Sequence, residues 1–159
     1  MRVTSYAGES KVVDMTVKHC AAPAECLTGS LNLGISRTLL NSKCCTTDLC
    51  NSQTVPVSSS GTPNGKQCYT CNGQDCLNIL NCLGDENSCI STTTDVSGQK
   101  VSMKGCASKS MCEGSMSAQL PGISVKVDCC EDNLCNDAGS LAASLLLLVA
   151  PLLSVALFH

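Results

Sequence analysis

The chain has 159 residues, a net charge of −3 at pH 7 and fifteen cysteines, but no tryptophan, two tyrosines and one phenylalanine. So few aromatic side chains bury little apolar surface, and the entropy cost of ordering the chain would leave a small domain marginal. Disulfides, each contributing about 2–4 kcal/mol, must supply the difference, and they persist only in an oxidising, extracellular compartment. The charges are mixed and form no basic stripe, and stacking aromatics are few, which excludes nucleic-acid binding.

The first segment, residues 1–51, begins with two β-like runs on either side of a small turn at Ala7-Gly8. Val13, Met15 and Val17 alternate along the second run, and alternation next to a short turn is typical of a β-hairpin. Five cysteines and an asparagine follow: Cys20, Cys26, Cys44, Cys45, Cys50 and Asn51.

Residues 52–66 read SQTVPVSSSGTPNGK and have no hydrophobic period. This composition is typical of a solvated linker, which we expect to separate the segments on either side. No Asn-x-Ser/Thr acceptor occurs in the sequence, so no N-glycan is expected. Candidate O-glycan sites in this linker are Thr54, Ser58, Ser59, Ser60 and Thr62.

Residues 67–136 hold the remaining ten cysteines and end on Asn136. The two segments close alike, the first with KCCTTDLCN and the second with DCCEDNLCN. When Cys20 is aligned with Cys106, five cysteines and the asparagine coincide with one inserted residue. This match indicates an internal repeat, whose first copy lacks the part that holds Cys68 to Cys89 in the second.

The first copy therefore corresponds to the second half of a unit, and residues 1–19 match residues 90–105. A charged and apolar leader does not follow Met1, although a disulfide-rich secreted protein needs an export signal. We therefore expect an N-terminally incomplete product, a fragment or a mis-started gene model; a genuine short isoform is the alternative. On the same reasoning, residues 67–136 should fold alone and residues 1–51 should not.

The tail after Asn136 is DAGS followed by LAASLLLLVAPLLSVALFH, with no charge between Leu141 and Phe158. This run is just long enough to cross a bilayer core of about 30 Å as a helix. Small residues before a terminal apolar run, without a basic flank, are typical of a GPI signal whose tail, residues 137–159, is removed. We expect a GPI-anchored protein on the extracellular face of the plasma membrane; a retained helix is the alternative. Asn136 is the first candidate for the attachment residue, followed by Asp137, with Ala138 and Gly139 left open.

The motif Cys68-Tyr69-Thr70-Cys71, the spacing of the ten cysteines and the closing CCEDNLCN resemble the lymphocyte-antigen-6 and urokinase-receptor family of three-finger domains. The resemblance implies a small, disulfide-rich, all-β fold, complete in residues 67–136 and present as a second half in residues 1–51. Ten cysteines alone allow many pairings. The pairs implied by the resemblance are Cys68–Cys89, Cys71–Cys76, Cys82–Cys106, Cys112–Cys129 and Cys130–Cys135, with Cys26–Cys44 and Cys45–Cys50 in the first copy. Cys20 is left unpaired, and Asn51 and Asn136 are implied to hydrogen-bond back into the disulfide knot.

Other interpretations of single motifs are weaker. Cys68-x2-Cys71 would also suit a redox pair or half a zinc site, but the other cysteines complete a disulfide pattern. His19 beside Cys20 suggests a thiol protease, yet neighbouring side chains on a strand point to opposite faces. Asp85-Glu86 and Glu131-Asp132 are charge runs that we interpret as solvated loops. We therefore expect no enzyme, hence no catalytic residue, no metal ligand, no cofactor and no small-molecule substrate.

By resemblance, function lies on loops that the knot holds rigid. We expect a non-catalytic cell-surface receptor or co-receptor that binds a protein ligand through these loops. The candidates are the finger after Cys71, the hairpin from Ser91 to Lys104 and the segment from Glu113 to Lys126. The middle hairpin is poor in aromatic anchors, so no binding hot spot stands out in it. One alternative is a secreted inhibitor, like the phospholipase inhibitors of the same fold, which has no use for an apolar tail. Another is a structural or adhesive surface protein.

Overall fold

The computed structural model describes residues 1–23, 26–56, 61–73, 75–96, 99–113 and 124–137. Strands dominate these ranges, which confirms the all-β class that the family resemblance implies. The elements are β1 (Arg2–Ala7), β2 (Ser10–Thr16), β3 (Gly29–Asn32), β4 (Ser36–Asn41), the 3-10 turn η2 (Cys50–Ser52), β5 (Pro63–Asn72), β6 (Asp75–Leu83), β7 (Ser88–Val96), β8 (Gln99–Ala107), α1 (Lys109–Glu113) and β9 (Ser124–Cys130). The expected linker therefore ends earlier than residue 66, because β5 begins at Pro63.

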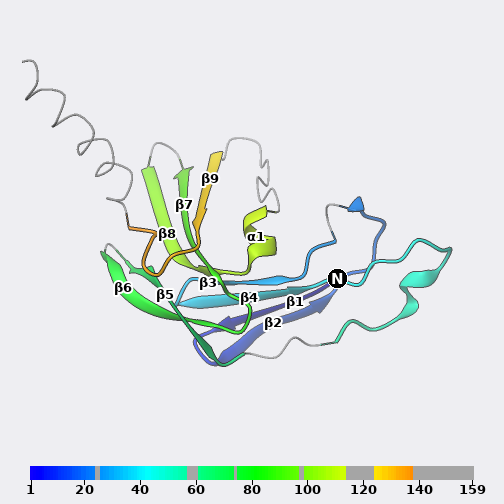
Figure 1. The fold of residues 1–159 in the computed structure, drawn as a ribbon. Helices are drawn as coiled ribbons and strands as arrows, with labels where there is room; N and C mark the ends of the chain where they lie inside the picture. Colours follow the sequence, from blue (N-terminus) through cyan, green and yellow to red (C-terminus); the bar gives the residue numbers. More distant parts are fainter. Residues whose placement is uncertain (24–25, 57–60, 74, 97–98, 114–123, 138–159) are drawn as a thin grey trace, which may run out of the picture.

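The strands form a seven-stranded antiparallel sheet in the order β2-β1-β4-β3-β8-β7-β9 and a separate hairpin, β5-β6 (Figure 1). The first unit, residues 1–51, contributes β2-β1-β4, and the second unit, residues 67–136, contributes β8-β7-β9. In each triplet the first strand of a hairpin lies between its hairpin partner and the last strand of the unit. The repeat seen in the cysteines is thus also a repeat of strand order.

A knot of four buried cysteines forms the core of the second unit. Cys68, Cys82, Cys89 and Cys106 are fully buried, and Leu80 packs against them. Two bridges lie side by side there, because the Sγ atoms of Cys68 and Cys82 are 3.4 Å apart. The described residues contain seven bridges, the same pairs that the resemblance implies: Cys26–Cys44, Cys45–Cys50, Cys68–Cys89, Cys71–Cys76, Cys82–Cys106, Cys112–Cys129 and Cys130–Cys135.

A second apolar cluster joins the two units. Ile90, Ala107 and Met111 of the second unit are buried, and Leu31 and Leu40 of the first unit pack against them. The strand pairing agrees with this contact, since Leu31 of β3 pairs with Ala107 of β8. The core of the second unit is therefore completed by side chains from the first.

The linker was expected to separate the two segments, and the structure shows them packed together instead. β8 has a free edge beside the knot, and a free strand edge readily accepts another strand. β3 occupies that edge, so one sheet runs through both units. Both ends of the linker also pack on the units: Arg2 Nη1 donates to the carbonyl of Val55 at 3.3 Å, and the N–H of Gly84 donates to the carbonyl of Thr62 at 2.9 Å.

The prediction that Asp85 and Glu86 are solvated is wrong for Glu86. Its side chain is 0% exposed and lies 2.6 Å from Nε of Arg37 in the first unit. Asp85 accepts a hydrogen bond from the hydroxyl of Ser30 at 3.0 Å. The partners lie about fifty residues away in the sequence, so a local charge pattern gives no sign of them.

The two closing asparagines differ. Asn136 is 5% exposed; its Oδ1 accepts the N–H of Tyr69 at 2.9 Å, and its Nδ2 donates to the carbonyls of Tyr69 at 2.9 Å and Ile90 at 3.0 Å. It therefore ties β5 to β7. Asn51 is exposed, and among the described residues its side chain has no hydrogen bond. The expectation for Asn51 fails because the described part of the first unit has no counterpart of β5.

This difference gives a matched pair of variants. Asn136→Ala should lower the free energy of unfolding by about 2–4 kcal/mol, because three hydrogen bonds are lost and buried backbone groups are left unpaired. Asn51→Ala should change it by less than about 0.5 kcal/mol, as is usual for an exposed position. Denaturant unfolding under non-reducing conditions measures both; equal effects would contradict the role of Asn136.

Candidate binding surface

The hairpin of β5 and β6, which we call finger 1, presents apolar side chains to solvent. On β6, Leu77 is 63% exposed and Ile79 is 58% exposed. They stand two residues apart and so share one face of the strand. Ile79 pairs directly with Tyr69 of β5, which places the ring on the same face. We call Tyr69, Leu77 and Ile79 the finger-1 patch.

The other face of the same hairpin points into the protein. Cys68 and Cys82 are buried in the knot and Leu80 packs on them, whereas Thr70 donates from its hydroxyl to the carbonyl of Leu33 at 2.8 Å. The inward face is therefore already satisfied by sulfur, apolar and hydrogen-bond contacts. Leu77 and Ile79 on the outward face are therefore candidates for an interaction site, because clusters of exposed apolar groups often mark such sites.

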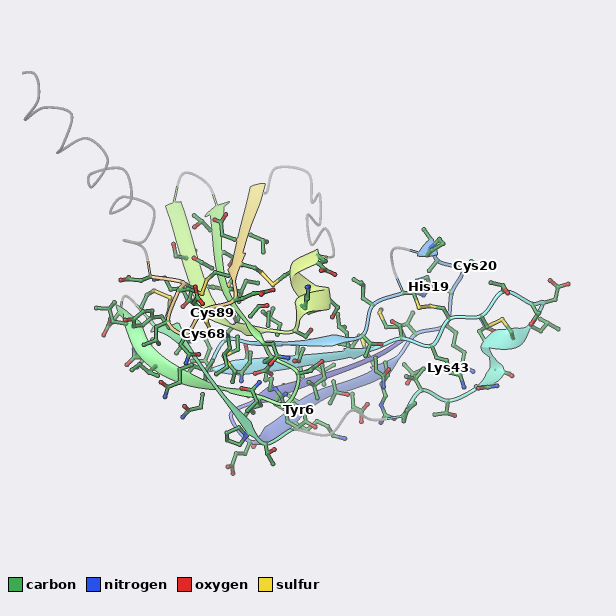
Figure 2. All side chains as sticks on the ribbon, in the orientation of Figure 1. Tyr6, His19, Cys20, Lys43, Cys68 and Cys89 are labelled. Carbon is green, nitrogen blue, oxygen red and sulfur yellow. A yellow bond between two sulfur atoms is a disulfide. The ribbon has the colours of Figure 1, made fainter. Side chains whose placement is uncertain are left out.

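The base of finger 1 is fixed by covalent bonds. Cys71–Cys76 closes the hairpin near its turn, and Cys68–Cys89 and Cys82–Cys106 join its two strands to β7 and β8. Figure 2 shows Cys68 and Cys89 together where β5 meets β7. A finger held in this way loses little conformational entropy when a ligand binds, so its apolar contacts count more fully toward affinity.

The hairpin of β7 and β8 is linked to this patch. Nζ of Lys104 lies 5.8 Å from the centroid of the Tyr69 ring, a cation–π distance, and Lys104 is buried. Val101 and Met103 are partly exposed and occupy the opposite face of β8. The tip of this hairpin, residues 97–98, and residues 114–123 of the third candidate segment lie outside the described residues.

Strand β2 of the first unit also exposes apolar side chains, but unlike the finger-1 patch it carries charged residues among them. Val12 and Met15 point to opposite faces, and the strand also carries the charged residues Lys11 and Asp14. Hydrogen bonds from Arg2 first, and then from Lys11, hold the pKa of Asp14 well below its usual range, so this carboxylate stays charged. Charges on an edge strand discourage pairing with other strands. The finger-1 patch is therefore the better candidate for ligand binding.

Cys20 is free and exposed, in the loop after β2. Figure 2 shows it beside His19, at the far side of the molecule from Cys68 and Cys89. A hollow of about 830 Å³ lies there, lined among others by Cys20, Lys43 and Leu49. The sulfurs of Cys68, Cys82 and Cys106 also approach within 4.8 Å of one another, but each belongs to a bridge and offers no thiolate to a metal ion.

Comparison with known proteins matches both units to described families. Residues 66–136 match the family model described as snake toxin and toxin-like protein, and residues 1–53 match that of the u-PAR/Ly-6 domain. The urokinase plasminogen activator surface receptor of Mus musculus is 37% identical over 59% of this chain and 32% of that protein. The same receptor of Rattus norvegicus is 31% identical over 84% of this chain and 44% of that protein. A gamma-type phospholipase A2 inhibitor of Laticauda semifasciata is 37% identical over 43% of each chain. The chain thus spans less than half the length of these relatives.

The exposure of Cys20 can be tested chemically. In the unreduced protein Cys20 should react with iodoacetamide, and oxidised material should contain a disulfide-linked dimer that Cys20→Ser removes, because an exposed unpaired thiol pairs between molecules. Peptide mapping under non-reducing conditions is the measurement. An internal bridge from Cys20 to Cys26 or to Cys44 would contradict the prediction.

Proposed function

Because the chain carries domains of the u-PAR/Ly-6 and toxin-like three-finger families, we propose that it is a non-catalytic cell-surface receptor or co-receptor that binds a protein ligand through finger 1. The observation that supports this most is the exposure of Leu77 and Ile79 on a hairpin fixed by three bridges. Packing of the knot does not explain why apolar residues occupy these solvent-facing positions, since the inward face of the hairpin makes the contacts with the knot.

A protein is the class of ligand that suits this surface. Leu77 and Ile79 stand on a strand face rather than in a deep cavity, and Asp75 and Asn81 border them with polar groups. Apolar anchors within a polar rim are the usual anatomy of a protein–protein interface, whereas small molecules prefer concave sites. The names of the relatives agree with a protein ligand: one is a receptor for a plasminogen activator and another is an inhibitor of a phospholipase.

The proposal includes a GPI anchor, attached at Asn136 or Asp137. The charge-free run from Leu141 to Phe158 supports it. This run lies outside the described residues; among those described, no helix is long and apolar enough to cross a membrane. Attachment at Asn136 uses its main-chain carboxyl group, so its side chain keeps the hydrogen bonds to Tyr69 and Ile90. A secreted inhibitor is the second candidate, which the name of the Laticauda relative favours.

The role of the finger-1 patch can be tested with charge substitutions. Leu77→Asp and Ile79→Asp should each weaken binding of the protein ligand at least about tenfold, because a buried contact is replaced by a desolvated charge. The probes are urokinase plasminogen activator and a phospholipase A2, each measured by biolayer interferometry. Leu49→Asp is the matched control, since Leu49 is 91% exposed on the first unit. Unchanged binding by both finger-1 variants would place the site elsewhere, and a wild type that binds neither probe would reject the ligands suggested by the relatives' names.

Anchoring can be tested on cells. Expressed behind an added signal peptide, the chain should appear at the cell surface and be released by phosphatidylinositol-specific phospholipase C, because only a lipid would hold it. A variant that ends at Asp137 should go directly into the medium. Surface protein that resists the active enzyme would indicate a retained helix, and secretion of the full chain would favour the inhibitor.

A further inference from the structure

The contact between the two units is concentrated in one hairpin of the first unit. β3 and β4 pair from Gly29 with Leu40 to Asn32 with Arg37, and the bridge Cys26–Cys44 closes the hairpin into a ring. Figure 1 shows β3 between β4 and β8. This ring is a compact element that owes its closure to its own disulfide rather than to the second unit.

The second unit meets this hairpin with a buried acid. Both carboxylate oxygens of Glu86 are used: Nε of Arg37 donates to Oε1 at 2.6 Å and Nδ2 of Asn32 donates to Oε2 at 3.3 Å. Its own unit supplies the N–H of Leu83 at 2.8 Å. A charge that is 0% exposed is costly unless it is paired. Glu86 is therefore matched only while the hairpin is in place.

Backbone and serine side-chain hydrogen bonds fix the register of the hairpin. The N–H of Ser30 donates to Oγ of Ser108 at 3.0 Å, and the N–H of Ser108 returns a bond to the carbonyl of Ser30 at 2.9 Å. The hydroxyl of Ser30 reaches Asp85, and the hydroxyl of Ser110 donates to the carbonyl of Thr28 at 2.6 Å. Each of these four hydrogen bonds joins the two units, and within the second unit the hydroxyls of Ser108 and Ser110 bond to each other at 3.0 Å.

The approach of β3 to β8 depends on a missing side chain. A Cβ at Gly105 would overlap the carbonyl oxygen of Asn32, and that atom is backbone and cannot turn away. In the alignment of Cys20 with Cys106, the position of Gly105 in the first unit is held by His19. The first unit has the same strand order, but its strand β2 ends at Thr16, before the position that aligns with Gly105.

We propose that Glu86 and the edge of β8 at Gly105 form a binding site on the second unit for a disulfide-closed β-hairpin. The ligand of this site is the hairpin of β3 and β4 in the first unit. Each bridge among the described residues lies within one unit, so only the linker joins the units covalently. When the linker is cut, the proposed site should hold the two fragments together as a non-covalent complex. This inference is independent of the proposed function.

The test is cleavage of the linker in the full chain. In a Cys20→Ser background, a protease recognition sequence is inserted between Val57 and Ser60, which leaves the packed residues Val55 and Thr62 in their own fragments. The protein is cut to completion in mild detergent and applied to size-exclusion chromatography without reductant. We expect both fragments in one peak at about 10 µM, as for a complex of micromolar or tighter affinity. Wild-type fragments that elute separately at this concentration would overturn the proposal.

Two variants and a control identify the site. Gly105→Ala should raise the dissociation constant of the cut protein at least about tenfold by blocking β3, and Arg37→Gln should do so by leaving Glu86 buried without its cation. Disulfide mapping detects whether Gly105→Ala impairs folding of the second unit. If it does, Arg37→Gln still tests the site, since Arg37 belongs to the first unit. Glu131→Gln, an exposed acid away from the hairpin, should behave as wild type. Dissociation constants unchanged in both variants would overturn the proposed site.

Discussion

The structure depends on two disulfides that touch. Cys68–Cys89 and Cys82–Cys106 meet at a sulfur–sulfur contact of 3.4 Å in a space with no exposure to solvent. In a chain with three aromatic residues, this sulfur cluster fills the volume that aromatic side chains fill in other small domains. It also brings β5, β6, β7 and β8 to one point, and Asn136 then closes β5 onto β7. The two hairpins of the second unit, β5-β6 and β7-β8, both extend from this knot.

The second unit has two distinct surfaces, one exposed to solvent and one covered by the first unit. The outward face of finger 1 exposes Leu77 and Ile79, whereas the region around Glu86 and the edge of β8 is covered by the first unit. The two surfaces do not share residues. The first unit contacts the inward face of finger 1, where Thr70 donates to the carbonyl of Leu33, and leaves Leu77 and Ile79 on the outward face exposed.

The sequence predicted the repeating and local features well and the contacts between units poorly. Cysteine spacing and the matching ends KCCTTDLCN and DCCEDNLCN indicated the repeat, and alternation around Ala7-Gly8 predicted the first hairpin, because these signals lie within short stretches. Glu86 looked like one of several loop charges, since its partner Arg37 is distant in sequence. Leu77 and Ile79 were missed for another reason. Alternation shows that a strand has two faces, but not which face turns to solvent when the knot is filled by sulfur.

The glycine at position 105 has a consequence for assembly. The contact between the units is heterologous, since a hairpin of one unit meets a different surface, a strand edge, of the next, and contacts of this kind can continue into open filaments. Continuation requires that every unit carry an edge that accepts a hairpin. Gly105 provides that edge in the second unit, whereas in the first unit β2 ends at Thr16, before the aligned position His19. The pairing of β3 with the edge of β8 therefore occurs once in the described part of the chain, and the contact between the units does not repeat within it.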